Sequence, residues 1–174
     1  FGVGDIDGNP DLFKMMAYCR QNKVVPNITI NGSRMTPALY TTLATLCGAV
    51  AVSHYDDDSC FKAVQALSDA GLKQVNIHQI LSKESLDDGT CMNLLKAKQN
   101  DERLKGLNAI VFLTLKPVGN RNDFTVPSPN DPKYLELIDY ALTNNIAIGF
   151  DSCGAYRFLS AIKFPINCMA IYGF

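Results

Sequence analysis

Apolar, β-rich runs alternate along this chain with segments of helical periodicity, and this alternation limits the possible folds more than any other feature. Most of the runs are nearly continuous, which is typical of strands buried on both faces. Because a helical pattern separates each run from the next, right-handed strand–helix–strand units and a parallel sheet are expected. The predicted strands are residues 24–30, 49–53, 74–81, 109–115, 146–150 and 168–172.

Helix start signals support this interpretation. A capping side chain precedes a proline at the first helical position in Asn9-Pro10, Thr36-Pro37 and Asp131-Pro132. Gly71 is expected to end a further helix in the left-handed conformation. Shorter helices are predicted around residues 94–98 and after residue 154.

The fold class predicted from this order is α/β, as a partial (β/α) TIM-type barrel with parallel strands. An open doubly wound sheet is the alternative, but Gly2-x-Gly4 lacks the third glycine of a dinucleotide-binding turn. The first residue is Phe1 and the last four residues still have a strand pattern, so we expect the barrel to be truncated at both ends.

Composition excludes several classes of function. Hydrophobic residues make up 47% of the 174 residues and charged residues 19%, which is not the composition of a disordered chain. A net charge of −1 gives no electrostatic reason to bind nucleic acid or an anionic membrane, and no apolar run approaches the roughly 20 residues that span a bilayer. The six cysteines are widely spaced, without a C-x-x-C pair, so we expect reduced thiols and a cytoplasmic protein.

Polar residues follow the predicted strands one after another. In a parallel barrel the active site lies at the carboxyl ends of the strands, so these residues predict a small-molecule site. The segment after Lys116, residues 117–130, is a candidate lid or binding loop on the same face. The strand ends are Gly4-Asp5, Asn31-Gly32, Ser53-His54, Ser82, Lys116 and Asp151-Ser152-Cys153.

The segment from Gly2 to Asp11 resembles the turn after the second strand of radical S-adenosylmethionine (SAM) enzymes, in a branch where it reads Gly-x-Gly-Asp-Pro-x-x-His-Pro. Ile6 stands where that pattern has proline, and Asn9 where it has histidine. Segments 18–32, 47–53, 75–82 and 106–119 are similar to the following elements of that branch, in the same order. Segment 149–153 resembles its entry into a cysteine-bearing C-terminal extension, which implies a barrel core over residues 1–152 and an extension over 153–174.

The resemblance implies an enzyme that cleaves SAM reductively at a [4Fe–4S] cluster. The 5′-deoxyadenosyl radical would then abstract hydrogen from a small-molecule or peptide substrate, with a flavodoxin or ferredoxin as electron donor. The chain contains no Cys-x3-Cys-x2-Cys, so these cluster ligands are expected upstream of Phe1.

The resemblance also gives roles to particular residues. Gly4 and Asp5 would hold the cofactor's ammonium group, while Asn31 and Ser53 would reach its carboxylate or ribose. Asn76 and His78 alternate along one strand, so they share a face and could contact the adenosine. Cys153 is a candidate ligand of an auxiliary cluster. For each site there is a structural alternative: a turn at Asp5 and Asn31, a hydrogen-bonded core pair at Asn76 and His78, and a free thiol at Cys153.

Two other functions stay open from the sequence. The departures at Ile6 and Asn9 fit a barrel of the same descent that binds or scaffolds without catalysis. An unrelated barrel lyase would use Lys116 at a strand end to form a Schiff base.

Overall fold

The computed structural model describes residues 6, 8–116, 123–152 and 154–155. The chain forms two compact units, one of Phe1–His78 with Asp101–Asn108 and the other of Gln79–Asn100 with Ala109–Phe174. The strands are β1 (Asn27–Ile30), β2 (Ala49–Ser53), β3 (Gln74–Leu81), β4 (Ala109–Thr114) and β5 (Ile148–Phe150). The helices are α1 (Leu12–Gln21), α2 (Pro37–Leu46), α3 (Asp57–Asp69), α4 (Lys83–Asp87), α5 (Thr90–Asn100), the 3₁₀ helix η1 (Glu102–Leu104) and α6 (Pro132–Thr143).

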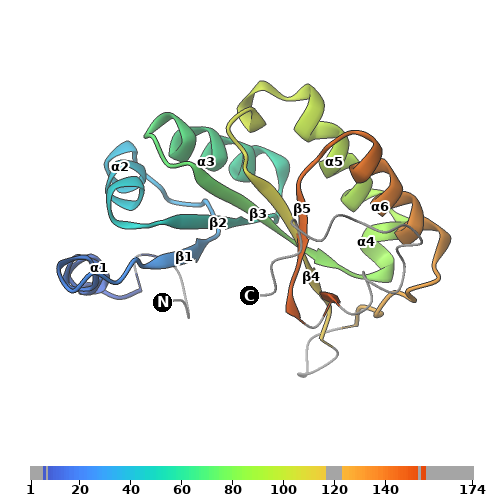
Figure 1. The fold of residues 1–174 in the computed structure, drawn as a ribbon, viewed down its shortest axis with the longest axis horizontal. Helices are drawn as coiled ribbons and strands as arrows, with labels where there is room; N and C mark the ends of the chain where they lie inside the picture. Colours follow the sequence, from blue (N-terminus) through green and yellow to red (C-terminus); the bar gives the residue numbers. More distant parts are fainter. Residues whose placement is uncertain (1–5, 7, 117–122, 153, 156–174) are drawn as a thin grey trace. The chain divides into compact units, whose positions relative to one another are not determined.

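The described strands form one sheet in the order β1-β2-β3-β4-β5, and the pairs β1–β2, β2–β3 and β4–β5 are parallel. β1 and β5 are the edges of this sheet, so it does not close on itself. Helices alternate with the strands along the chain (Figure 1). The predicted α/β fold with a partial parallel barrel is therefore confirmed.

In the first unit, the parallel register sorts the side chains of β1, β2 and β3 onto two faces. Ile28 pairs with Val50 and Val50 with Val75, and Ile30, Val52 and Ile77 follow in the next buried row. α3 packs against β2 and against α2, and it contributes Phe61, Val64 and Leu67 to the core (Figure 1). Helices thus cover the apolar face of these strands.

In the second unit, aromatic rings join α6 to the strands. The Phe112 and Phe150 rings of β4 and β5 lie 5.8 Å apart, and Tyr134 of α6 meets Phe150 edge-on at 6.2 Å. Helices α4, α5 and α6 pack against one another and bury Leu94 and Leu137, among others (Figure 1).

The structure confirms most predicted elements and moves some boundaries. β2 and β3 have the predicted ends, and Thr36 and Asp131 cap α2 and α6 as expected. α1 begins at Leu12, two residues after Pro10, because the Asn9 side chain accepts a hydrogen bond from the Asp11 N–H and forms a turn first.

Two strands are shorter than predicted. β1 begins at residue 27, directly after Pro26, which has no N–H to donate to a ladder. β5 begins at residue 148 because the Ile146 N–H donates to the Ala141 carbonyl oxygen and closes α6. The predicted strand 168–172 lies outside the described residues, as does most of the predicted helix after residue 154. None of the helices in the described part of the chain has the length and apolar character needed to span a bilayer.

Replacing Gly32 by alanine should destabilise the protein more than replacing Gly71 by alanine. Both glycines have left-handed φ, +78° and +95°, so alanine at either costs about 1 kcal/mol in backbone strain. A Cβ at Gly32 would also lie 3.1 Å from both the Ala63 Cβ and the Ser59 carbonyl oxygen, whereas at Gly71 it would meet nothing within 4 Å. We expect a loss of about 2–3 kcal/mol for Gly32→Ala and about 1 kcal/mol for Gly71→Ala in urea unfolding. Equal losses would contradict the tight packing at Gly32.

Candidate functional site

The face of β1–β3 opposite the buried rows carries polar side chains near the carboxyl ends of β1 and β2 and at the neighbouring positions of β3. Ser53 pairs in register with His78. Two residues earlier on each strand, and so on the same face, Ala51 pairs with Asn76. Asn31 follows Ile30, whose partner is Val52, so Asn31 comes at the same level as Ser53. The structure thus brings Asn31, Ser53, Asn76 and His78 to one face of the first unit.

Ser53 and His78 are the most available polar groups in this set. Both side chains are half-buried, and neither makes a hydrogen bond to a residue that the structure describes. Within the described residues, every fully buried side-chain nitrogen or oxygen has a hydrogen-bond partner. The polar atoms of Ser53 and His78 have none, so they are not fully buried and reach solvent. Burial lowers the pKa of His78 below its usual value, which favours the neutral ring with one donor and one acceptor nitrogen. A hydroxyl and a neutral imidazole side by side suit a polar, uncharged part of a ligand.

The Asn76 carboxamide is partly engaged. Its oxygen accepts a hydrogen bond of 2.9 Å from the side-chain nitrogen of Asn108, and the Asn108 N–H donates to the Val75 carbonyl oxygen. Asn108 was not among the predicted site residues. No sequence signal marks it, because it lies 32 positions from its partner.

Asn31 is tied into its own turn. Its side-chain oxygen accepts hydrogen bonds from the N–H of Ser33 at 2.8 Å and from the Ser33 hydroxyl at 2.9 Å. Gly32 then turns the chain close to Ala63 of α3. This side chain therefore has a clear structural role at the carboxyl end of β1.

His54 is packed rather than presented to a ligand. Its side chain is 6% exposed, its Nε2 lies 2.7 Å from an Asp57 carboxylate oxygen, and its ring stacks on Phe61 at 6.1 Å. The two departures in the glycine-rich turn have structural reasons as well. Ile6 is buried in the core, and Asn9 forms the turn before α1.

Other predicted residues lie outside the described part of the chain, namely Gly4, Asp5 and Cys153. Four cysteines are described, and all are free. Burial raises the pKa of Cys47 and Cys91 to about 11 and that of Cys60 to about 12, which disfavours the thiolate that a metal requires. Within the described residues no three His, Cys, Asp or Glu side chains group together as a metal site. The described residues therefore do not fit an iron–sulfur cluster.

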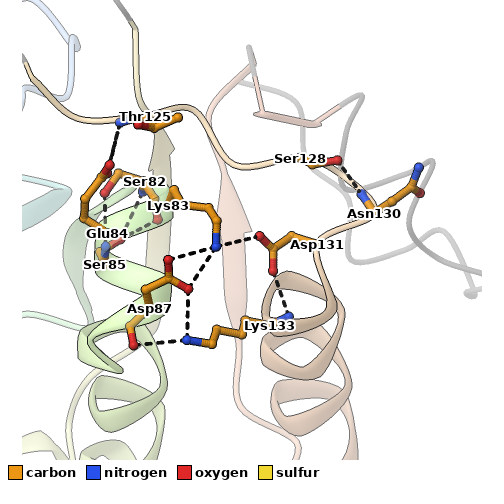
Figure 2. Close-up of polar contacts among 10 residues, drawn as sticks. All are labelled: Ser82, Lys83, Glu84, Ser85, Asp87, Thr125, Ser128, Asn130, Asp131 and Lys133. Atoms are coloured by element: carbon orange, nitrogen blue, oxygen red, sulfur yellow. Dashed lines mark hydrogen bonds and ion pairs between the residues drawn. The ribbon is translucent and has the colours of Figure 1, made fainter.

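In the second unit, the segment 123–131 is anchored to α4 directly after β3 (Figure 2). The Thr125 N–H donates to both carboxylate oxygens of Glu84 at 3.0 Å, and the Lys83 N–H donates to the Thr125 carbonyl oxygen at 2.8 Å. Ser82 caps α4 in a reciprocal box with Ser85. The hydrogen bond from the Thr125 N–H is the main cause that lowers the pKa of Glu84 to about 2.

An ion-pair network lies beside this anchor (Figure 2). Lys83 Nζ contacts both Asp87 carboxylate oxygens at 2.8 and 2.9 Å and lies 3.4 Å from Asp131, the N-cap of α6. Lys133 Nζ lies 2.9 Å from the same Asp87 carboxylate. The hydrogen bond from Lys83 is the main cause that lowers the pKa of Asp87. The network links α4 to the start of α6.

Lys116 is more than half exposed, and its Nζ lies 3.9 Å from an Asp151 carboxylate oxygen. Asp151 Oδ1 accepts hydrogen bonds from the N–H groups of Thr114 and Gly154, so it joins the carboxyl ends of β4 and β5. This is a surface ion pair, not the apolar pocket that activates a Schiff-base lysine.

Two solved structures of one protein are similar to this chain. The chain shares the fold of Streptococcus suis SuiB. One SuiB crystal structure matches 98% of this chain at 15% identity with a TM-score of 0.67. Another, of SuiB bound to SAM, matches 92% at 14% identity with a TM-score of 0.63. This chain spans about two fifths of SuiB, 42% and 40% in the two structures. No protein-family model and no curated protein matches the sequence.

The pKa of His78 should make stability depend on pH in a defined window. The folded-state pKa lies below the unfolded value of about 6.5, so the unfolded chain takes up this proton first as the pH falls. The contribution of neutral His78 is therefore complete above about pH 6.5 and decreases as the pH falls towards the folded-state pKa. We expect an NMR titration of the ring with a midpoint below 6.5, and a smaller loss of stability in His78→Gln than in the unmodified protein as the pH falls below about 6.5. A midpoint above 6.5 would contradict the burial of this ring.

Glu84→Gln should loosen the segment around Thr125. Glutamine keeps only one of the two side-chain oxygens that accept a hydrogen bond from the Thr125 N–H. The backbone N–H groups of Thr125 and Lys83 should therefore exchange hydrogen several-fold faster. The folded-state pKa of Glu84 is about 2. In the unmodified protein, the protection of these two N–H groups from exchange should therefore persist at pH values below the usual pKa of a carboxyl group, and it should be lost as the pH falls through about 2. Glu136→Gln on the exposed surface of α6 is the control and should leave both amides unchanged. Unchanged exchange in Glu84→Gln would show that the anchor does not depend on the carboxylate.

Proposed function

We propose that this chain is the SAM-binding barrel core of a radical SAM enzyme. The pairing of Ser53, the last residue of β2, with His78 of the parallel strand β3 carries the proposal. Two further findings support it: the ordered sequence motifs resemble radical SAM enzymes, and the chain shares its fold with SuiB, which has been solved with SAM bound.

Ser53, Asn76 and His78 fit the uncharged part of this cofactor. The Ser53 hydroxyl can donate to or accept from a ribose hydroxyl, and the neutral His78 ring offers one donor and one acceptor. The side-chain nitrogen of Asn76 can donate a hydrogen bond on the same face, while the side-chain oxygen accepts one from Asn108. Bound SAM would supply the sulfonium group whose reductive cleavage produces the radical.

The cluster that reduces SAM has no place among the described cysteines. We propose that its ligands come from a Cys-x3-Cys-x2-Cys segment upstream of Phe1. Cys153 stays a proposed ligand of an auxiliary cluster. The substrate, a small molecule or peptide, and the flavodoxin or ferredoxin donor are proposals on the same basis, as is a cytoplasmic location.

SAM binding should depend on Ser53 and His78. In calorimetric titration of the protein with its natural flanking sequence, Ser53→Ala and His78→Ala should each weaken SAM by about tenfold, as expected for one hydrogen bond of about 1.4 kcal/mol. Ser68→Ala is the matched control, because its hydroxyl bonds the Val64 carbonyl oxygen within α3. Equal affinity in all variants would contradict the assignment of these side chains.

Catalysis is tested separately on the same protein, reconstituted with iron and sulfide without oxygen. Brown colour and release of 5′-deoxyadenosine after addition of SAM and reductant would support the enzyme. SAM binding without cleavage would instead support a non-catalytic binding or scaffold module. Failure to bind SAM would overturn both.

A further inference from the structure

The second unit has a hollow of about 190 Å³ between its helices, where the turn from α4 to α5 meets α6. None of its lining residues belongs to the polar face of the first unit, so the proposed SAM site leaves this hollow unexplained. Three apolar and three charged side chains line it: Leu86, Met92, Leu137, Asp87, Lys133 and Glu136.

The buried part of this lining is apolar. Leu86 is 6% exposed and Leu137 is 1% exposed, so both are part of the core, and Met92 at the start of α5 is half-buried. Methionine is flexible and polarizable, and it is enriched in surfaces that bind other proteins. The floor of the hollow therefore suits an aliphatic chain better than a polar group.

The lysine at the rim is already paired (Figure 2). Lys133 Nζ lies 2.9 Å from an Asp87 carboxylate oxygen, and it donates to the Asp87 carbonyl oxygen at 3.1 Å. Lys83 contacts the same carboxylate from within α4. Asp87 and the two lysines thus neutralise one another, and Glu136 is the charged group of the lining that is left for a ligand.

Glu136 is exposed on α6 and forms no hydrogen bond or ion pair with a residue that the structure describes. Asp88, on the turn from α4 to α5, and Asp139, one helical turn after Glu136, form no ion pair in the described chain either. Against these three acids stands Lys96 of α5, which is also without an ion pair there. The surroundings of the hollow therefore carry an excess of negative charge, which attracts a cation.

The size of the hollow limits what can enter it. Pockets for drug-sized ligands and cofactors measure about 300–1,000 Å³, whereas a cavity of about 150 Å³ holds a single benzene ring. A hollow of about 190 Å³ therefore suits one side chain. Its apolar floor and acidic rim suit a side chain with a long aliphatic stem and a positive end.

We propose that the hollow between α4, α5 and α6 binds an arginine side chain of a protein partner. The aliphatic part of the arginine lies on Met92 and Leu137, and its guanidinium pairs with the Glu136 carboxylate through two parallel hydrogen bonds. Arginine fits better than lysine because its guanidinium is planar and more weakly hydrated, and because it is enriched at protein interfaces. The inference does not depend on SAM binding.

The test titrates N-acetyl-arginine amide into the protein with its natural flanking sequence, labelled with ¹³C at the methionine methyl groups. The Met92 signal reports on the hollow directly, and its absence from the spectrum of Met92→Leu identifies it. We expect a saturable shift of this signal with a Kd of about 1–10 mM at low salt, as for a ligand of this size. N-acetyl-citrulline amide, with a neutral urea group in place of the guanidinium, should bind about fivefold more weakly.

Glu136→Gln should weaken the binding of N-acetyl-arginine amide about three- to fivefold, which is the effect of losing one exposed ion pair. Added salt should weaken binding to the unmodified protein in the same direction, because it screens this pair. Glu102→Gln is the matched control: Glu102 is an exposed glutamate of the first unit that also forms no ion pair in the described chain. This variant should change the Kd by less than about twofold.

Each other outcome overturns a stated part of the inference. A Met92 signal without a saturable shift would overturn the hollow as a binding site. Equal binding of the arginine and citrulline probes, or unchanged affinity in Glu136→Gln, would overturn the pairing with Glu136. Agmatine, a free guanidinium compound, separates the sources: binding tenfold tighter than that of N-acetyl-arginine amide would assign the hollow to a small molecule and overturn the protein partner. None of these titrations contains SAM, so the proposed function is decided by its own test.

Discussion

The parallel register of β1, β2 and β3 is the constraint from which the candidate site follows. Because partners in a parallel ladder point to the same face, one register sets both the buried rows and the polar row that alternates with them. Val52 and Ile77 can be covered by helices only if Ser53 and His78 lie on the opposite face. A shift of one residue would bury the polar pair and expose the core, so packing on one face fixes the chemistry on the other.

The strand–helix alternation and the polar strand ends could be predicted from the sequence because they depend on near neighbours. Alternation alone placed Asn76 and His78 on one face, and capping residues next to prolines placed the starts of α2 and α6. The anchor between Glu84 and Thr125 could not be predicted, since its partners are 41 positions apart and lie in an irregular segment.

The two units differ in whether their polar side chains are paired with one another. In the second unit the carboxylates and lysines near α4 are paired with one another, and they hold a connecting segment and the start of α6. On the polar face of the first unit, Ser53 and His78 keep their hydrogen-bonding capacity while their backbones are fixed in the sheet. Unsatisfied capacity on a rigid element is what a pre-organised ligand site needs, and satisfied pairs are what a support needs.

The first unit is not a continuous stretch of sequence, and this affects how the chain can fold during synthesis. Residues 101–108 belong to it although β3, α4 and α5 come before them. Arg103 from this late segment lies over the Phe61 ring at 5.1 Å and pairs with Asp58 at 3.3 Å. On the ribosome, α3 and β2 therefore emerge well before the residues that complete their packing, and the first unit can reach its final form only after residue 108 has left the exit tunnel.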